Sequence, residues 1–137
     1  MSRGDDAAAV EEAKARFYQA FESLELARMD EVWSHGNHVR CVHPGWRLLC
    51  GWDAVRQSWE AIFRGSAEMR FGITDVDVHV EGDVAMVTCR ENILSHARGQ
   101  IAVTALVATN VFERHDGAWL MIHHHASATL AGDAGSA

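Results

Sequence analysis

The first half of the chain has the hydrophobic spacing of helices. Between residues 5 and 27 apolar side chains recur every three or four positions and charged side chains fill the other side, which predicts an amphipathic helix. A short second helix is expected over residues 30–36 and a third over residues 53–65, each opening at an aspartate and closing at a glycine. Residues 39–45 read as a brief extended segment that ends in a Pro-Gly turn.

After residue 65 the spacing of apolar side chains falls to every second position. Four long strands are predicted, over residues 70–80, 84–96, 100–114 and 118–128. The turns between them contain glycine, and consecutive strands joined by short turns form an antiparallel meander. Three helices followed by such strands predict an α+β domain in which the helices cover one face of a curved antiparallel sheet.

The composition is typical of one soluble domain. With 137 residues, 48% of them apolar, the chain can build a core without disulfide or metal staples. We expect a single domain over residues 1–131 and a frayed tail over residues 132–137. An acidic N-terminus and the lack of a long apolar run predict a cytoplasmic protein that is neither exported nor membrane-bound. The three cysteines are expected to be reduced, small core residues: Cys41, Cys50 and Cys89.

Charge and strand pattern indicate which partners to expect. The chain has 12 Lys and Arg against 19 Asp and Glu, and the resulting net charge of −7 repels the phosphates of nucleic acids and anionic membranes. No nucleic acid and no membrane is therefore expected as a partner. In residues 101–111 both alternating faces are largely apolar, so one face can pack on the helices and the other on a second subunit. We expect a homodimer formed through the sheet.

Histidines are numerous, nine in all, and three of them are consecutive on the last predicted strand. Because strand side chains alternate, His123 and His125 share one face and His124 takes the other. Such an H-x-H pair can bind a metal ion if a third ligand joins it, and His43 or Glu91 would have to supply that ligand. The alternative is that the pair makes hydrogen bonds in the sheet or at a subunit interface. No metal or other cofactor is assigned.

His43 and Glu91 are the candidate catalytic residues. His43 precedes the Pro-Gly turn, where an imidazole with a pKa of about 6.5 can act as a general base; the alternative is a turn histidine bonded to backbone. Glu91 falls on the apolar phase of its strand, where a carboxylate needs a partner inside a pocket, unless Arg90 and its neighbours leave the strand exposed. Asn110 is likewise a single amide in an apolar run, suited to orient a ligand carbonyl or to satisfy neighbouring backbone.

Aromatic side chains are numerous enough to line an apolar cavity. The chain has five Trp, five Phe and one Tyr, although many of these are equally expected in an ordinary core. Trp46, directly after the turn glycine, is expected at the mouth of the pocket. No phosphate-binding loop, nucleophile elbow or reactive-cysteine motif supports nucleotide or acyl-enzyme chemistry. The candidate ligand-binding residues are Tyr18, Trp46, Trp59, Asn110, His123, His124 and His125.

Several segments together carry a family resemblance: His-Pro-Gly-Trp at 43–46, Gly-Trp-Asp-Ala-Val at 51–55, Ser-Trp at 58–59, Thr-Cys-Arg-Glu-Asn at 88–92, Ala-Thr-Asn-Val-Phe at 108–112, and the histidine strand at 119–127. In this order they resemble the SnoaL-like family of the nuclear-transport-factor-2-like superfamily. The resemblance covers nearly the whole chain. It implies a cone in which helices wrap a curved sheet around a cavity, commonly dimeric through the sheet. The cone hosts isomerases, cyclases, dehydratases and non-catalytic modules, so it implies no single activity.

Two relatives within this superfamily bear on the pocket. Ketosteroid isomerases carry an aspartate base followed by proline in the extended segment, and His43-Pro44 is similar in position, which implies proton transfer by His43. The oxyanion donors of that isomerase have no equivalents here. The association domain of calmodulin-dependent kinase ends in a similar histidine strand, but its pocket arginines correspond to Glu91, Asn110 and Ala126. This difference implies a neutral or cationic ligand rather than a carboxylate.

The expected function is therefore that of a small-molecule pocket protein. Its chemistry would be that of an isomerase, cyclase or dehydratase, with general acid–base catalysis on a small hydrophobic carbonyl compound. His43 would move the proton, while Glu91 would hold the partner charge or a ligand hydroxyl. The first alternative is a ligand-binding or oligomerisation module without chemistry. The second is a metal-dependent enzyme that uses the H-x-H pair.

Overall fold

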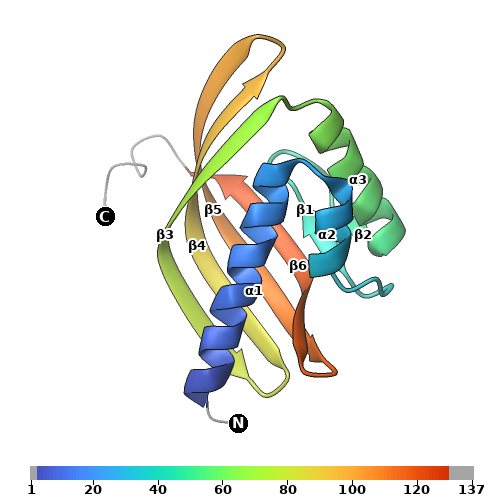
Figure 1. Ribbon diagram of the computed structural model, residues 1–137, viewed down its shortest axis with the longest axis vertical. Coiled ribbons are helices and arrows are strands. Elements are labelled where there is room, and N and C mark those ends of the chain that lie inside the picture. The colour runs from blue at the N-terminus through green and yellow to red at the C-terminus, as the bar shows by residue number, and fades with distance from the viewer. Residues whose placement is uncertain (1–2, 130–137) are drawn as a thin grey trace.

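The computed structural model describes residues 3–129, which form three helices and six strands (Figure 1). The helices are α1 (Arg3–Ser23), α2 (Leu26–Val32) and α3 (Trp52–Arg64). The strands are β1 (Arg40–Val42), β2 (Leu49–Cys50), β3 (Glu68–Glu81), β4 (Val84–Ala97), β5 (Gln100–His115) and β6 (Ala118–Ala128). Within residues 3–129, no helix is both long enough and apolar enough to cross a membrane. The tail expected at residues 132–137 lies outside the described residues.

The six strands form one curved sheet in the order β2-β1-β6-β5-β4-β3. Strands β3 to β6 make the predicted antiparallel meander, and α1 crosses one face of it, as Figure 1 shows. The sheet is mixed rather than wholly antiparallel, because β1 runs parallel to β6, with Cys41 opposite His124. β1 enters the sheet from the helical segment rather than through a hairpin, so no tight turn requires it to run antiparallel.

The core lies between the inner face of the sheet and the helices. On α1 the apolar positions recur at helical spacing, and Val10 and Phe17 are fully buried. On the sheet every second residue points inward, so that Val87 of β4 and Phe112 of β5 are fully buried. The helical and strand periods of the sequence therefore contribute to a single core, which includes the fully buried Trp59 of α3.

The helix boundaries differ from expectation at several points. α1 ends at Ser23 rather than near residue 27, and α2 ends at Val32, so Gly36 does not close this helix. α2 begins at Leu26 rather than Asp30, because Leu24 takes a left-handed φ of 57° that ends α1 and lets the next helix start at once. α3 begins directly after Gly51, whose φ of 86° favours glycine. Asp53 is therefore not the cap but lies in the first turn, where its charge still suits the helix dipole.

Two features of the sheet edge and surface complete the fold. The two-residue strand β2 was not predicted, since two residues are too few to show alternation. Cys50 on this edge strand is exposed, unlike the buried Cys41 and Cys89, so the prediction of a core role is wrong for Cys50. The outer face of the sheet carries exposed apolar side chains on β4 and β5, which are Val84, Met86, Leu94, Ile101, Val103 and Val107.

Candidate functional site

A cavity of about 280 Å³ lies between the helices and the inner face of the sheet. Its wall brings together three titratable side chains from different elements: His43 from the segment after β1, Glu91 from β4 and His124 from β6. Each of these three is at most 2% exposed. Most of the remaining wall is apolar: Phe21, Pro44, Trp46, Ile62, Met69, Ile93, Leu106 and Ala126. An apolar pocket with a few converging polar groups is the usual form of a small-molecule site.

A chain of buried hydrogen bonds links two of these groups behind the cavity wall. His124 Nδ1 lies 2.6 Å from Asn110 Oδ1, and because an amide oxygen only accepts, Nδ1 carries the proton and donates it. Asn110 Nδ2 then donates to Tyr18 Oη at 2.9 Å, and Tyr18 Oη donates to Glu91 Oε2 at 2.6 Å. Every donor in this chain points toward Glu91. These hydrogen bonds do not involve His124 Nε2, which carries a lone pair, or the second carboxylate oxygen of Glu91.

Burial changes the acidity of the groups at both ends of this chain. Loss of water around the Glu91 carboxyl raises its pKa to about 7, although the hydrogen bond from Tyr18 opposes the shift. The pKa of Tyr18 is raised well above its usual range by burial and by the adjacent Glu91 charge, so its hydroxyl keeps its proton. Burial holds the pKa of His124 well below 6.5. At neutral pH the site therefore combines a neutral imidazole with a carboxyl that exchanges its proton readily.

His43, in the segment after β1, borders the same cavity but lies outside this chain of hydrogen bonds. Its Nε2 lies 2.8 Å from Ser58 Oγ, and the Ser58 hydroxyl itself donates to the carbonyl of Val55 at 2.6 Å. Because that serine proton is engaged, Nε2–H of His43 is the donor, and the lone pair stays on Nδ1. Burial lowers the pKa of His43 to about 4, so this imidazole is also neutral at pH 7. The ring of Trp59 packs edge-on against it, with centroids 4.7 Å apart.

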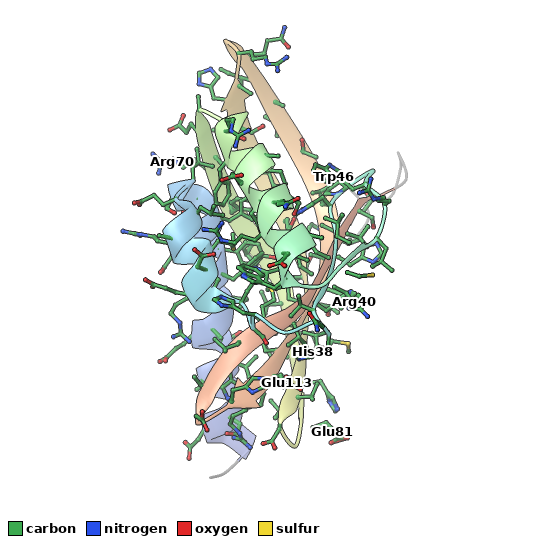
Figure 2. The ribbon with its side chains drawn as sticks, turned by 90° about the vertical axis from the view of Figure 1, so that its right-hand side faces the viewer. His38, Arg40, Trp46, Arg70, Glu81 and Glu113 are labelled. Carbon is green, nitrogen blue, oxygen red and sulfur yellow. The ribbon has the colours of Figure 1, made fainter. Side chains whose placement is uncertain are left out.

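The structure divides the nine candidate residues into three groups. His43, Trp46, Glu91 and His124 border the cavity, and Trp46, 43% exposed and labelled in Figure 2, stands at its entrance. Three residues support the wall from behind: Tyr18, Trp59 and Asn110. Asn110 has both its amide groups engaged by protein, so it positions neighbours rather than facing the cavity. His123 and His125 lie on the outer face of the sheet, opposite to the buried His124.

This arrangement removes the geometry on which the H-x-H metal hypothesis depended. The rings of His123 and His125 do lie near each other, with centroids 6.2 Å apart. The third ligands considered for them, His43 and Glu91, are on the inner face of the sheet with His124. Neither can share an ion with the outer pair, because the sheet itself separates them.

Sequence reasoning missed three polar residues of the site. Ser58 lies on the buried side of α3 beside Val55 and Trp59 and fixes the tautomer of His43. A hydroxyl within an apolar helical stripe was the signal that could have revealed it. Ser95 and Thr104 border the cavity on β4 and β5. Their positions follow only from the pairing of these strands, where Thr104 lies opposite Ile93.

This chain matches one family model and is similar to several solved structures. Residues 10–131 match the model of the SnoaL-like domain. A crystal structure of a putative dehydratase from the NTF2-like family of Streptomyces avermitilis is 37% identical, with a TM-score of 0.89 over 95% of this chain and 100% of that one. A putative calcium/calmodulin-dependent protein kinase type II association domain from Thiobacillus denitrificans is 32% identical, with a TM-score of 0.78 over 88% of this chain and 94% of that one.

A longer plant protein is similar to most of this chain. The F-box protein SKIP8 of Arabidopsis thaliana is 29% identical over 125 residues, which is 91% of this chain and 52% of that protein. This chain thus spans about half the length of that relative. The domain match covers most of the chain, and the related structures extend over nearly all of it. The chain belongs to the SnoaL-like family and has the fold of the NTF2-like superfamily.

Proposed function

We propose that this protein is a proton-transfer enzyme, an isomerase, cyclase or dehydratase, acting on a small hydrophobic carbonyl compound. One observation carries the proposal: two neutral imidazoles and a carboxyl whose pKa is about 7 border the same apolar cavity. At neutral pH a neutral imidazole of this set can accept a proton from the substrate, and the carboxyl can donate one to it. The S. avermitilis relative, described as a putative dehydratase, is consistent with this class.

The roles follow from the protonation states. The lone pair on His43 Nδ1 takes a proton from the carbon next to the substrate carbonyl, and His124 Nε2 accepts a hydrogen bond from a substrate hydroxyl. Glu91 in its protonated form gives its proton to the oxygen that gains charge. In an isomerisation this is the carbonyl oxygen of the substrate, which becomes the hydroxyl of the enol intermediate. In a dehydration it is the oxygen of the leaving hydroxyl, which departs as water. The apolar wall excludes bulk water from the intermediate.

Hydrogen–deuterium exchange of a ketone tests the proton-transfer step directly. The probe is 4-phenylbutan-2-one in D₂O, and loss of its α-proton signals is followed by proton NMR with and without protein. We expect protein-dependent exchange that Glu91→Gln or His43→Gln slows by about 100-fold or more, as for removal of a general acid or base. His79→Gln, an exposed histidine on β3, is the matched control and should leave the exchange rate unchanged.

A second candidate function is that of a binding module without chemistry. The observation in its favour is that the polar chain from His124 to Glu91 is complete without a ligand, as a purely structural network would be. The 32% identity to an association domain agrees with it. In the exchange experiment this function predicts saturable shifts of protein NMR signals by the ketone, together with an exchange rate equal to that in buffer. That outcome would replace the enzyme proposal.

We also propose that the partner of the outer sheet face is a second copy of this chain. Val103 is 82% exposed and Ile101 67% exposed, on the outer face of β5 near its start, where residues 100–104 are exposed on both faces. Together with Leu94, which lies opposite Val103, these two residues form an apolar stripe at one end of the outer face. The same stripe on a second copy can cover it, since one surface then serves both partners. Dimerisation also places the cavities on the far sides of the two sheets, where they stay open to ligand.

A further inference from the structure

A second group of titratable side chains lies on the outer face of the sheet, away from the cavity. It consists of His38, just before β1, and Glu113 and His115 at the end of β5. Along β5 the side chain of Phe112 points into the core and that of Arg114 reaches Asp6 of α1, so Glu113 and His115 point outward. Figure 2 shows His38 and Glu113 close together.

Three ligand atoms converge within this group. His38 Nε2 lies 2.9 Å from Glu113 Oε1, and His115 Nε2 lies 2.5 Å from the same oxygen. All three atoms lie within 4.8 Å of one another. In a tetrahedral zinc site with bonds of about 2.0–2.1 Å, neighbouring ligand atoms are roughly 3.3 Å apart, so only small movements of exposed rings would admit an ion. The two N–H protons now directed at one carboxylate would give way to a single cation.

The surrounding chain holds these residues in position. Gly36 lies so close to the His38 ring that a Cβ on this glycine would come within 2.5 Å of His38 Nδ1. The His38 ring can occupy this position only because residue 36 is a glycine and has no side chain. On the other side, His115 closes the hairpin to β6, whose turn is made by Asp116 and Gly117 with positive φ. The two halves of the group are thus set by a tight turn and by a local close approach.

We propose that His38, Glu113 and His115 form a binding site for one divalent transition-metal ion of the Zn²⁺ class. Two imidazole nitrogens and one carboxylate oxygen suit Zn²⁺, Ni²⁺ or Cu²⁺, whereas Mg²⁺ and Ca²⁺ require mostly oxygen ligands. The side chains of His38 and His115 are 48% and 46% exposed, which leaves coordination positions for water and allows the ion to exchange. Among residues 3–129 no other set of three such ligands meets this closely.

The bound ion would join two parts of the fold that are far apart in sequence. His38 belongs to the segment that leads from α2 into β1, while its two partners belong to β5. An ion held by both binds the folded chain and not the unfolded one, so it should raise the melting temperature. Two arginines lie near these ligands along the chain, and both are engaged elsewhere. Arg114 forms ion pairs with Asp6 and Asp83, and Arg40 donates to the carbonyls of Asn37 and Val39.

Zinc titration of the untagged protein tests this site. We expect isothermal titration calorimetry to give one Zn²⁺ per chain, Mg²⁺ to give no heat, and Zn²⁺ to raise the melting temperature. His38→Ala and His115→Ala should each weaken Zn²⁺ binding at least tenfold and abolish the rise in melting temperature. Gly36→Ala removes no ligand, yet it should also weaken binding, because the new Cβ displaces the His38 ring.

Two further variants separate this site from other histidines. His79→Ala, an exposed histidine on β3, should bind Zn²⁺ as the wild type does. His125→Ala removes one member of the H-x-H pair and should also leave binding unchanged. The proposal is overturned if the wild type binds no Zn²⁺, or if His125→Ala abolishes binding while His38→Ala and His115→Ala do not. Circular dichroism of each variant without metal verifies that it is folded.

Discussion

Glu91 is the residue of the candidate site whose pKa the fold brings to neutral pH. A free glutamate carboxyl has a pKa of 4.5, and burial in the cavity wall raises the pKa of Glu91 to about 7. Since the carboxyl binds its proton more tightly in the folded chain than in the unfolded chain, its contribution to stability is complete below about pH 4.5. That contribution is lost as the pH rises through about 7. Glu91 is therefore both the candidate proton donor and a built-in cost to stability at alkaline pH.

Replacing Glu91 by glutamine should reverse this cost. An amide side chain cannot ionise, so the stability of Glu91→Gln relative to the wild type should increase by about 3 kcal/mol between pH 4 and pH 8.5, at about 1.4 kcal/mol per pKa unit. Urea unfolding followed by tryptophan fluorescence at the two pH values measures the change. Glu11→Gln on the exposed side of α1 is the control. A stability difference that is the same at both pH values would show that Glu91 ionises as freely in the folded chain as in water.

At the scale of elements, α1 connects the core to the candidate site. Phe17 is fully buried, and its ring centroid lies 5.8 Å from that of Trp59 and 5.0 Å from that of His124. The next residue, Tyr18, donates a hydrogen bond from α1 to the carboxylate of Glu91 on β4. One turn of helix thus packs against α3 and β6 and orients the carboxyl on β4. Loss of packing at this turn should disturb both stability and the site.

Phe17→Ala should lower the free energy of unfolding by about 3–5 kcal/mol, the usual cost of removing a buried phenylalanine. The substitution also removes the ring that packs on His124, so ketone binding should weaken together with stability. Thermal unfolding and NMR titration with 4-phenylbutan-2-one measure the two effects. Glu12→Ala on the exposed side of the same helix should change neither. A cost below about 1 kcal/mol for Phe17→Ala would contradict the packing described for α1.

At the scale of the whole molecule, the two faces of the sheet have different tasks. The inner face bears the core and the cavity, while the outer face bears the apolar stripe and the group of His38, Glu113 and His115. The stripe residues Ile101 and Val103 lie near the opposite end of β5 from Glu113. A second copy that covers Leu94, Ile101 and Val103 thus leaves the metal ligands accessible, and Val84, which pairs with Glu113, then lies outside the interface.

Val103→Glu should convert a dimer into a monomer. A charge within an apolar interface is costly to bury, and Val103, 82% exposed in the single chain, lies opposite the exposed Leu94. Size-exclusion chromatography with light scattering should give twice 15.1 kDa for the wild type and 15.1 kDa for the variant. Leu48→Glu, at an exposed leucine outside the sheet, should remain dimeric. A wild type that is monomeric at high micromolar concentration would exclude this interface.

The sequence by itself determined the elements and much of the inner face of the sheet. Helical and strand periods follow from covalent geometry, which is the same in any fold, so the order of three helices and four long strands could be predicted. The same alternation placed Glu91 on an apolar face and His124 opposite to His123 and His125. The face on which a strand side chain lies is set by its neighbours along the same strand, whatever packs on the other side of the core.

Only the tertiary structure decided which side chains meet. Tyr18 and Glu91 are 73 residues apart, and His38 and Glu113 are 75 residues apart, so neither pair leaves a local pattern. The parallel pairing of β1 with β6 brings His43 to the cavity that Glu91 and His124 border. Which face of β6 is inside depends on where the helices pack. The acidity of Glu91 depends in turn on that burial, because loss of water around the carboxylate disfavours its charge and raises its pKa to about 7.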